Sequence, residues 1–331
     1  MAISNDILSS TLRILLDKEV DNLFKAVPVL DSMKKAGGVE TYDGGQKLDV
    51  PLILAEHSSI TQLSNGYEPV NLAVKDALRN ATFDWCDFVA PVVITQKEEL
   101  SNKGPRAIVS IAEARMKSVM GLLQREVEKQ IVAHGSSVLT ELNSLVDTAG
   151  GAGRNGLLQD VAFGSQAGSV GGLNVASFPT FQNQYVKQAG ALALDDLTEL
   201  YIACQANTPA GASPNLIVMD NTTYRAYKSL LFDKERFMSA DKLDGGRLAL
   251  MFHGAACYYD PFLDSVTTGA GDTVSALFLN TEYLKLAFDS SAQFEMSDFE
   301  HISGYASRSA NIFTRMQLYV QHLASQGILT R

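Results

Sequence analysis

The glycine spacing of a dinucleotide-binding loop occurs in this chain as Gly151-x-Gly153-x-x-Gly156. Such a loop holds a pyrophosphate because a strand leads into it, a helix N-terminus follows it, and an acidic residue stands about twenty positions further on. The stretch before it instead has apolar residues at helical spacing, and eight glycines fall between residues 150 and 172; the apolar residues are Val138, Leu142 and Leu145. We therefore expect an irregular glycine-rich connection that repeatedly visits positive φ, and no nucleotide site.

Other residue sets could do chemistry only with partners that the sequence does not supply. Two pairs of carboxylates are adjacent, at Glu98-Glu99 and Asp195-Asp196. Neighbours in a regular element cannot both point into one cleft, so we interpret both pairs as solvated helix starts. His253 and Cys257 have a ligand spacing, but "MFHGAACYYD" offers no second pair and is typical of a strand with a turn. The sequence therefore predicts no catalytic residue, no cofactor and no metal.

The composition bounds the class of protein. Hydrophobic residues make up 46% of the 331 residues and charged residues 19%, which excludes a disordered chain. The longest apolar run, "FVAPVVI", is far shorter than the roughly 20 residues that span a bilayer, so no membrane is expected. Cys86, Cys204 and Cys257 imply no disulfide framework and favour a reducing cytoplasm. The net charge of −10, without a clustered basic face, argues against tight nucleic-acid binding.

The first third of the chain predicts a helix and then a long hairpin. Apolar residues at helical steps favour a helix that ends before Pro28; they are Leu8, Leu12, Leu15, Leu16, Val20, Leu23 and Val27. Leu48, Val50, Leu52 and Leu54 then alternate with Lys47, Asp49 and Pro51, as in a half-buried strand. Asn65-Gly66 favours a turn, and "NATFDWCDFVAPVVIT" predicts the returning strand, with a bulge near Cys86 and Asp87. An isolated two-stranded arm is marginally stable, which suggests self-association.

The middle and the end of the chain predict a long helix and a strand-rich remainder. Pro105 and Gly135 bracket a helix that runs to about His134 and spans roughly 45 Å. The residues Leu216 to Met219 predict a buried strand, and Asp220 a cap for a helix that carries Tyr224, Tyr227 and Leu231 on one side. In "NIFTRMQLYVQH" both parities carry large residues, so we expect a last strand that is buried on both faces.

This order of elements resembles the major capsid protein of tailed bacteriophages, with the Hong Kong 97-type fold. The segment "GSVGGLNVASFPTFQNQYV" is similar to a family stretch, with matches at Gly171, Gly172, Leu173, Asn174, Phe178, Pro179 and Asn183. The resemblance implies an α+β fold with an N-terminal arm helix (1–40), an extended-loop hairpin (41–97), a peripheral domain (98–191) with a spine helix (105–134) and a Gly-rich loop, an axial α/β domain (192–280), and strands that return to the peripheral domain (281–331).

The resemblance also implies a function, which is assembly and not catalysis. Copies are expected to form hexamers and pentamers that close into an icosahedral or prolate head shell around double-stranded DNA, without sequence-specific binding. Portal, scaffolding and decoration proteins are the expected partners, and the shell is expected to assemble in the host bacterial cytoplasm and become part of the virion. The candidate contacts between copies are Ile60, Leu63, Tyr67, Trp85, Lys234, Arg236 and Lys242. Two alternatives stay open: a cellular nanocompartment shell of the same fold, and a nucleotide-binding α/β enzyme.

Overall fold

The computed structural model describes residues 28–35, 37–55, 62, 64, 66, 77–101, 111–208, 211–232, 241–242 and 248–331. The chain divides into two compact units. The larger consists of Ala26–Val89, Glu126–Glu295 and Phe313–Arg331, and the smaller of Met1–Lys25, Ala90–Arg125 and Met296–Ile312. The predicted helix before Pro28 and most of the predicted hairpin tip at 58–69 lie outside the described residues.

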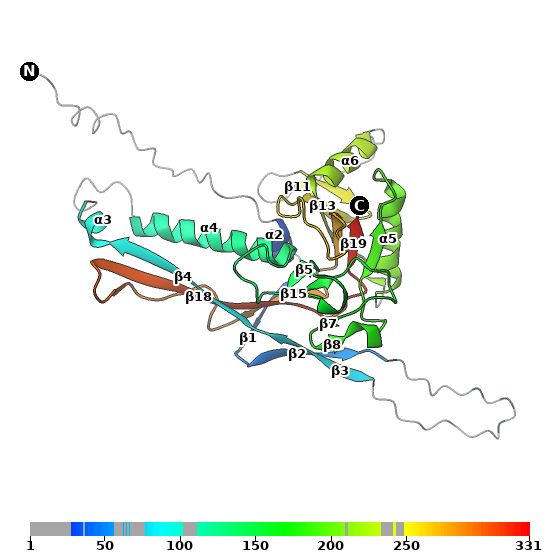
Figure 1. Ribbon diagram of the computed structural model, residues 1–331, viewed down its shortest axis with the longest axis horizontal. Helices are drawn as coiled ribbons and strands as arrows, with labels where there is room; N and C mark the ends of the chain where they lie inside the picture. Colours follow the sequence, from blue (N-terminus) through cyan, green and yellow to red (C-terminus); the bar gives the residue numbers. More distant parts are fainter. Residues whose placement is uncertain are drawn as a thin grey trace, which may run out of the picture. The chain divides into compact units, whose positions relative to one another are not determined.

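A seven-stranded sheet forms one part of the larger unit, as far as the described residues extend (Figure 1). Its order is β11 (Asp241–Lys242), β12 (Leu248–Phe252), β13 (Ala255–Tyr259), β10 (Leu216–Met219), β14 (Val274–Leu279), β19 (Gly327–Thr330) and β9 (Gln184–Lys187). The pairs β10–β13 and β19–β9 are parallel, and the other pairs are antiparallel. All four residues of β10 are buried, which confirms the predicted buried strand.

Two helices pack on this sheet, α5 (Leu194–Ala206) and α6 (Asn221–Phe232). The predicted cap of α6 is confirmed, because the Thr223 N–H donates to Asp220 Oδ1 at 2.8 Å. Tyr201 of α5 and Tyr227 of α6 both contact the ring of Phe252 edge-on, with centroids 5.9 and 6.0 Å apart. Both helices therefore share one apolar core with the same face of the sheet.

The second sheet is built around β18 (Ser307–Val320). It contains β1 (Val39–Tyr42), β15 (Leu284–Asp289), β16 (Glu295–Met296), β17 (Glu300–His301) and β4 (Cys86–Thr95). The strand β18 alternates between buried and open positions from Ala310 to Thr314, and every residue from Met316 to Val320 is buried. The predicted burial on both faces is thus confirmed for the last part of the strand.

The predicted hairpin is present as β2 (Lys47–Ile53) paired with β3 (Leu78–Asp84), from Lys47 opposite Asp84 to Ile53 opposite Leu78. Burial alternates along β2 as expected. The Thr82 N–H donates to the Gly171 carbonyl at 2.8 Å, so the hairpin rests on the short hairpin β7 (Ser169–Val170) and β8 (Leu173–Asn174). A Cβ on Gly171 would lie 2.9 Å from both Ala81 and the Phe83 ring, and this close approach requires glycine.

The prediction of a bulge near Cys86 and Asp87 is wrong, because the structure has a break between two strands there and not a bulge within one. The irregular residue is Trp85, which separates β3 from β4. The physical reason is a change of partner: β3 pairs with β2, whereas β4 pairs with β18. A chain that passes from one ladder to another interrupts its own strand, and the parity of its side chains shifts as it does at a bulge.

The glycine-rich connection corrects one expectation and confirms another. The helical spacing of Val138, Leu142 and Leu145 does not form a helix; Leu145 lies in β5 (Ser144–Val146), which pairs in parallel with β6 (Gly156–Leu158). That pairing joins residues a dozen positions apart, so it produces no regular spacing of apolar residues along either short strand. Positive φ occurs, as expected, at Gly150, Gly151, Gly164, Gly168, Gly171 and Gly172. The short 3₁₀ turns η1 (Gly151–Gly153) and η2 (Val175–Ser177) complete the connection.

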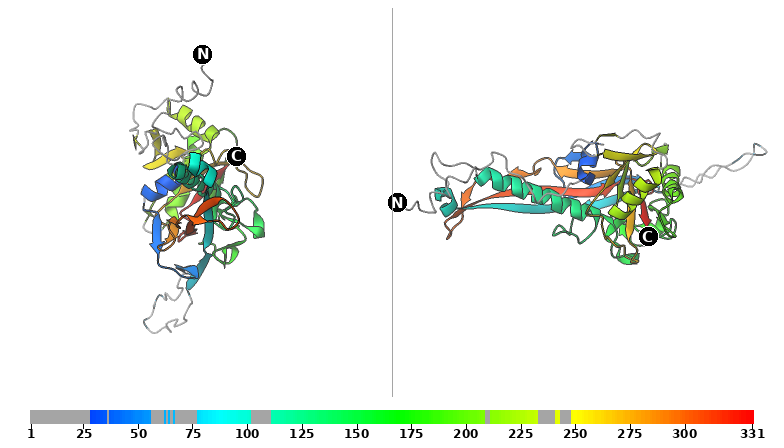
Figure 2. Two further views of the ribbon diagram at one scale, coloured as in Figure 1. Left: turned by 90° about the vertical axis from the view of Figure 1, so that its left-hand side faces the viewer. Right: turned by 90° about the horizontal axis from the view of Figure 1, so that it is seen from above.

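The long predicted helix is observed as α4, Ile111–Val132, and residues 102–110 are not described. The right-hand view of Figure 2 shows it along its length as one continuous helix. Gly135 follows its end with φ of 74°. In the smaller unit, Thr95 donates through its N–H to Glu98, which caps α3 (Gln96–Ser101), and Arg115 of α4 forms an ion pair with Glu98.

A short helix, α2 (Pro28–Lys35), is attached to α4 through a buried carboxylate in the larger unit. The N–H groups of Val29 and Leu30 donate to the two carboxylate oxygens of Glu128 at 2.8 and 3.0 Å. The first N–H groups of a helix have no partner within it, and Glu128 supplies one for two of them.

Candidate functional site

Amides in and just before the glycine motif at 151–156 are bound by a side chain of the same chain. The N–H groups of Ala149, Gly150 and Asn155 all donate to Asp147 Oδ1, at 3.1, 3.2 and 3.1 Å. A phosphate-binding loop must leave such amides free for the ligand. The loop continues into the strand β6 and not into a helix, so the geometry of a dinucleotide site is missing here.

Gly156 of the motif serves backbone packing. A Cβ at this position would lie 2.4 Å from three backbone atoms of Val146 and Asp147. Gly153 has open space around it, because a Cβ on this residue would meet no atom within 4 Å. The glycine spacing therefore reflects one close strand contact and one unconstrained turn, which explains the motif without a ligand.

Buried amides hold the rest of the connection. The Asn183 Nδ2 donates to the carbonyls of Gln159 and Gln184 at 2.9 and 3.0 Å, and its Oδ1 accepts from the Gln159 N–H at 2.9 Å. The Gln166 Nε2 donates to the Asn183 carbonyl at 2.7 Å, and Gln182 Oε1 accepts from the Gly164 N–H at 2.7 Å. Asn183, one of the residues that carried the family resemblance, is thus a structural residue with no exposed surface.

Arg154 lies within the same network. Its Nε donates to the Gly156 carbonyl at 2.8 Å and a terminal nitrogen donates to the Leu157 carbonyl. Burial lowers the pKa of Arg154 to about 10, and the Asp147 carboxylate acts in the opposite direction. The guanidinium stays protonated near neutral pH and ties the turn to β6.

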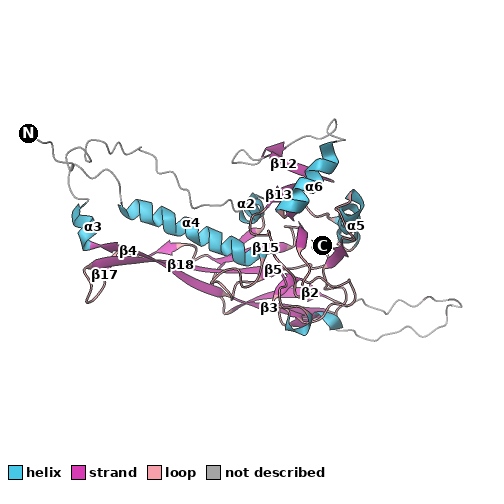
Figure 3. Ribbon diagram, turned by 45° about the horizontal axis from the view of Figure 1, so that its top comes forward, coloured by secondary structure: helices cyan, strands magenta, loops and turns pink. Residues whose placement is uncertain are grey.

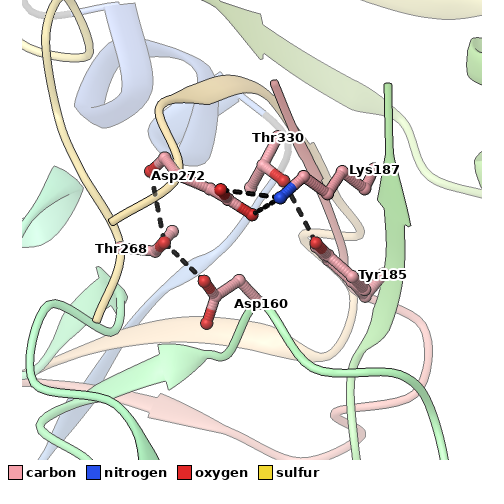
Figure 4. Close-up of polar contacts among 6 residues, drawn as sticks. All are labelled: Asp160, Tyr185, Lys187, Thr268, Asp272 and Thr330. Atoms are coloured by element: carbon pink, nitrogen blue, oxygen red, sulfur yellow. Dashed lines mark hydrogen bonds and ion pairs between the residues drawn. The ribbon is translucent and has the colours of Figure 1, made fainter. Parts of the chain in front are cut away.

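A polar cluster next to this network holds a lysine but no reactive amine (Figure 4). The Lys187 Nζ lies 2.6 and 2.8 Å from the two carboxylate oxygens of Asp272, and this hydrogen bond raises the pKa of the lysine. Thr268 donates to Asp160, and Thr330 Oγ1 donates to the Tyr185 hydroxyl at 3.3 Å. These contacts join β9 and β19 to the loops around Asp160 and Asp272, and the pairing with Asp272 favours the charged form of the lysine.

A second titratable cluster ties β1 to β15 and β18. The hydroxyls of Tyr42 and Tyr319 both donate to Glu40 Oε2, at 2.5 and 2.8 Å, and Lys285 Nζ lies 3.3 Å from Glu40 Oε1. The hydrogen bond from Tyr42 is the main reason that the pKa of Glu40 is lowered. The carboxylate is a shared acceptor for three elements, which is a structural role.

The remaining chemical candidates are separated or buried. His253 is the first residue of a turn with φ of 47°, and Cys257 is buried in β13, where desolvation raises its thiol pKa to about 12. Within the described ranges, no three His, Cys, Asp or Glu side chains gather as metal ligands would. None of the helices described there is both long enough and apolar enough to cross a bilayer.

The predicted contact residues fall in two groups. Five of them lie outside the described residues, namely Ile60, Leu63, Tyr67, Lys234 and Arg236. The other two are Lys242 and Trp85, and Lys242 lies in β11 opposite Leu248. Trp85 is only 7% exposed, and the Arg315 guanidinium carbon lies 5.4 Å from its ring centroid. Arg315 also forms ion pairs with Asp87 and Asp289, at 3.0 and 3.5 Å. Trp85 therefore packs within its own chain, and its contact with a second copy stays a prediction.

Several exposed apolar side chains were not predicted. Ile53 is 78% exposed and Leu78 62%, and they lie directly opposite each other at the end of the β2–β3 ladder. Ile202 on α5 is 55% exposed, and Val89 on β4 is 53% exposed. The signal for Ile53 was present in the sequence, because this residue falls on the parity of Lys47, Asp49 and Pro51, where a polar side chain belongs.

Comparison with known proteins identifies the fold through structure alone. No protein-family model and no curated protein matches the chain. A chain of the cyanophage A-1(L) capsid asymmetric unit is similar over 99% of both chains, with a TM-score of 0.65 and 11% identity. The capsid of a native GTA particle is similar over 98% of this chain and 97% of that chain, with a TM-score of 0.61 and 13% identity.

A third similar structure is the holo-SrpI encapsulin complex from Synechococcus elongatus PCC 7942, over 100% of this chain and 96% of that chain, with a TM-score of 0.54 and 13% identity. Identities this low carry the fold and not the activity. The chain has the α+β fold of these shell proteins, which confirms the Hong Kong 97-type fold expected from the order of its elements.

Proposed function

We propose that this chain is a major capsid protein, whose copies form hexamers and pentamers that close into a head shell around double-stranded phage DNA. The observation that carries the proposal is the similarity to the cyanophage capsid chain over 99% of both lengths. A shared fold without a large insertion or omission supports a shared use of the whole chain, and that use is assembly.

The exposed end of the β2–β3 hairpin supports a role in contacts between copies. A two-stranded ribbon gains little stability by itself, and its inner face is already anchored at Gly171. Ile53 and Leu78 form a cross-strand apolar pair that faces outward. Covering this pair with a second copy removes apolar surface from water, which favours association.

The buried networks support a structural and not a catalytic role. Three amides in or just before the glycine motif, those of Ala149, Gly150 and Asn155, donate to Asp147, and the lysine of the polar cluster is paired with Asp272. The net charge of −10 suits a container that must not bind its DNA tightly, because tight binding requires many Lys and Arg contacts with phosphates.

The domain roles and partners follow from the same proposal. The hairpin at 41–97 acts as the extended loop, 98–191 and 281–331 form the peripheral domain, and 192–280 forms the axial domain. Ile60, Leu63, Tyr67, Trp85, Lys234, Arg236 and Lys242 contribute to contacts between copies. Portal, scaffolding and decoration proteins complete the shell, which assembles in the bacterial cytoplasm and becomes part of the virion.

Electron microscopy of the purified protein tests the proposal. We expect closed particles for the wild-type chain, and only unassembled subunits when residues 58–69 are deleted. Gly153→Ala is the control, because its new methyl group meets open space and leaves assembly intact. A wild-type chain that stays monomeric in every buffer that favours assembly refutes the proposal, and saturable NAD or ATP binding that Gly153→Ala abolishes would favour the enzyme alternative.

A cellular nanocompartment is the second candidate, and the similarity to the SrpI encapsulin complex favours it. The two candidates differ in their contents. Particles purified from the native source are treated with nuclease and then opened: protected double-stranded DNA supports the capsid, and an enclosed protein without DNA supports the nanocompartment.

A further inference from the structure

The two helices on the seven-stranded sheet carry opposite charges. The helix α5 contains Asp195, Asp196 and Glu199 and no lysine or arginine. The helix α6 contains Arg225 and Lys228 and no aspartate or glutamate. Asp195, Glu199, Arg225 and Lys228 are all exposed. One face of the larger unit thus presents an acidic helix and a basic helix.

The helices lie over different strands of the sheet (Figure 3). The helix α5 packs on β9 and β19, towards one edge, whereas α6 packs on β13 and β14. Their inner sides share one apolar core, so their charged sides point away from the sheet. The acidic and basic faces are therefore two separate patches at different places on one copy.

Neither patch is neutralised within the described part of the chain. No ion pair there joins Asp195, Asp196 or Glu199 to a cation, or Arg225 or Lys228 to a carboxylate. Carboxylates in the first turn of a helix are common because they oppose its dipole, and Asp196 also accepts from the Ala193 N–H at 3.1 Å. Glu199 lies in the second turn, where the helix dipole no longer accounts for a carboxylate because its effect falls off within the first turn.

An exposed isoleucine lies within the acidic face. Ile202 is 55% exposed and follows Glu199 by three positions and Asp195 by seven, so the three side chains share one side of α5. An apolar centre with a charged rim is the usual composition of a protein contact, in which the centre supplies most of the affinity and the rim supplies orientation.

We propose that the acidic face of α5, centred on Ile202, docks against the basic face of α6 on the next copy of the chain. When successive copies make this contact head to tail, it is heterologous, and repeated contacts of this kind close into rings. The inference rests on the proposed function and deepens it, because it assigns the surface that sets the order of copies around a capsomer. Charge complementarity steers such an encounter and rejects the reversed arrangement, in which like charges would meet.

Charge reversal tests the contact on the full-length chain. One variant carries Asp195→Lys with Glu199→Lys, and the other carries Arg225→Glu with Lys228→Glu. Each variant places like charges in the contact, and we expect each to raise the protein concentration needed for assembly roughly tenfold or more at low salt. Circular dichroism and thermal unfolding verify that each variant is folded.

Restored complementarity separates the contact from a general effect of charge. A chain with all four substitutions again has one acidic and one basic face, and we expect it to assemble close to the wild-type level. A mixture of the two reversed variants also pairs correctly, but only when the two kinds alternate. Alternation closes only rings with an even number of copies, so native mass spectrometry should detect hexamers and no pentamers.

The controls keep the outcomes apart. Glu282→Lys reverses one acidic charge, half the change of the Asp195→Lys, Glu199→Lys variant, at an exposed site outside both helices and should leave assembly unchanged. If the wild-type chain forms no particles, the proposed function fails. If the wild-type chain assembles and the reversed variants assemble equally well, or the fourfold variant is no better than either parent, the α5–α6 contact is wrong while the capsid function stands.

Discussion

The seven-stranded sheet and the glycine-rich connection belong to the same unit but are stabilised by opposite means. The sheet buries apolar side chains such as Ile217, Phe278 and Leu329 against α5 and α6. In the connection, many of the fully buried side chains are polar, among them Asp147, Gln159, Gln166, Gln182 and Asn183. The sheet is thus stabilised by close packing of apolar side chains, and the connection by hydrogen bonds between specific polar groups.

This difference predicts how each region responds to substitution. A smaller apolar side chain in the sheet loses contacts in proportion to the atoms removed. A missing partner in the connection leaves a buried donor or acceptor unpaired, and the cost is that of removing it from water without compensation. Similar changes in side-chain size should therefore have unequal effects in the two regions, as measured by urea unfolding of the unassembled subunit.

Gly156→Ala should have the largest effect. Its methyl group would lie 2.4 Å from the backbone of Val146 and Asp147, and backbone cannot rotate away. We expect a loss of about 5 kcal/mol or more in the free energy of unfolding, or an insoluble product. Gly153→Ala, in the same loop with open space, should change it by less than about 0.5 kcal/mol. Equal effects of the two substitutions would contradict the close strand contact.

Asn183→Leu should come next. The side chains have similar volume, but leucine leaves the Gln159 N–H and the carbonyls of Gln159 and Gln184 without their partner. We expect a loss of about 3 to 4 kcal/mol, shown as a lower urea midpoint with an unchanged slope. Asn311→Leu on the exposed part of β18 is the matched control and should be nearly neutral. A small loss at both positions would mean that the network adds little.

Glu128 gives a pH-dependent version of the same test. Burial first, and the Asp260 carboxylate second, raise the pKa of Glu128 well above its ordinary value of 4.5, although the N–H groups of Val29 and Leu30 act against this. A carboxyl with a raised folded-state pKa contributes stability that is present below pH 4.5 and is lost as the pH rises through the folded pKa.

Through this group, the free energy of unfolding of the wild-type chain should therefore fall by up to about 1.4 kcal/mol for each pH unit between 4.5 and the folded-state pKa. Glu128→Gln cannot ionise, so the variant does not share this loss. We expect the amount by which its free energy of unfolding falls below that of the wild type to shrink as the pH rises from 5 to 7. Urea unfolding of both proteins at each pH measures this difference. A deficit that grows over this range would show that the two N–H groups outweigh burial.

Phe278→Leu should have the smallest effect. Phe278 is fully buried in the sheet, and leucine keeps an apolar side chain of lower volume there. We expect a loss of about 1 kcal/mol, well below that of Asn183→Leu. Phe278→Ala extends the series, with a loss of about 3 to 5 kcal/mol. A leucine variant as unstable as Asn183→Leu would remove the distinction between the two regions.

The same contrast decides what could be predicted from the sequence. The alternation at Leu48, Val50 and Leu52, the buried strand before Asp220 and the last strand were predictable because burial leaves a period along the chain. The network around Asn183 was not, because hydrogen bonds between side chains and distant backbone follow no period. The strand at Ser144–Val146 was missed for a related reason, since its partner Gly156–Leu158 defines it and its own spacing is misleading.

The candidate contact surfaces were only partly accessible to the same reasoning. Ile53 could have been noticed as an apolar residue on a polar parity. Trp85 was a predicted contact residue, but its place beside Arg315 depends on the pairing of strands far apart in sequence. The opposite charges of α5 and α6 are visible in the sequence, but their meaning depends on both helices lying on one face of one sheet.

The parallel pairing of β9 with β19 has a consequence for biosynthesis. Gln184 leaves the ribosome long before Gly327, and the roughly 140 residues between them take on the order of ten seconds to translate. During that delay the early strand has no neighbour on the side that β19 later fills. Nascent chains on one polysome can then exchange these strands, so slow translation or crowded synthesis should yield intertwined dimers instead of properly closed subunits.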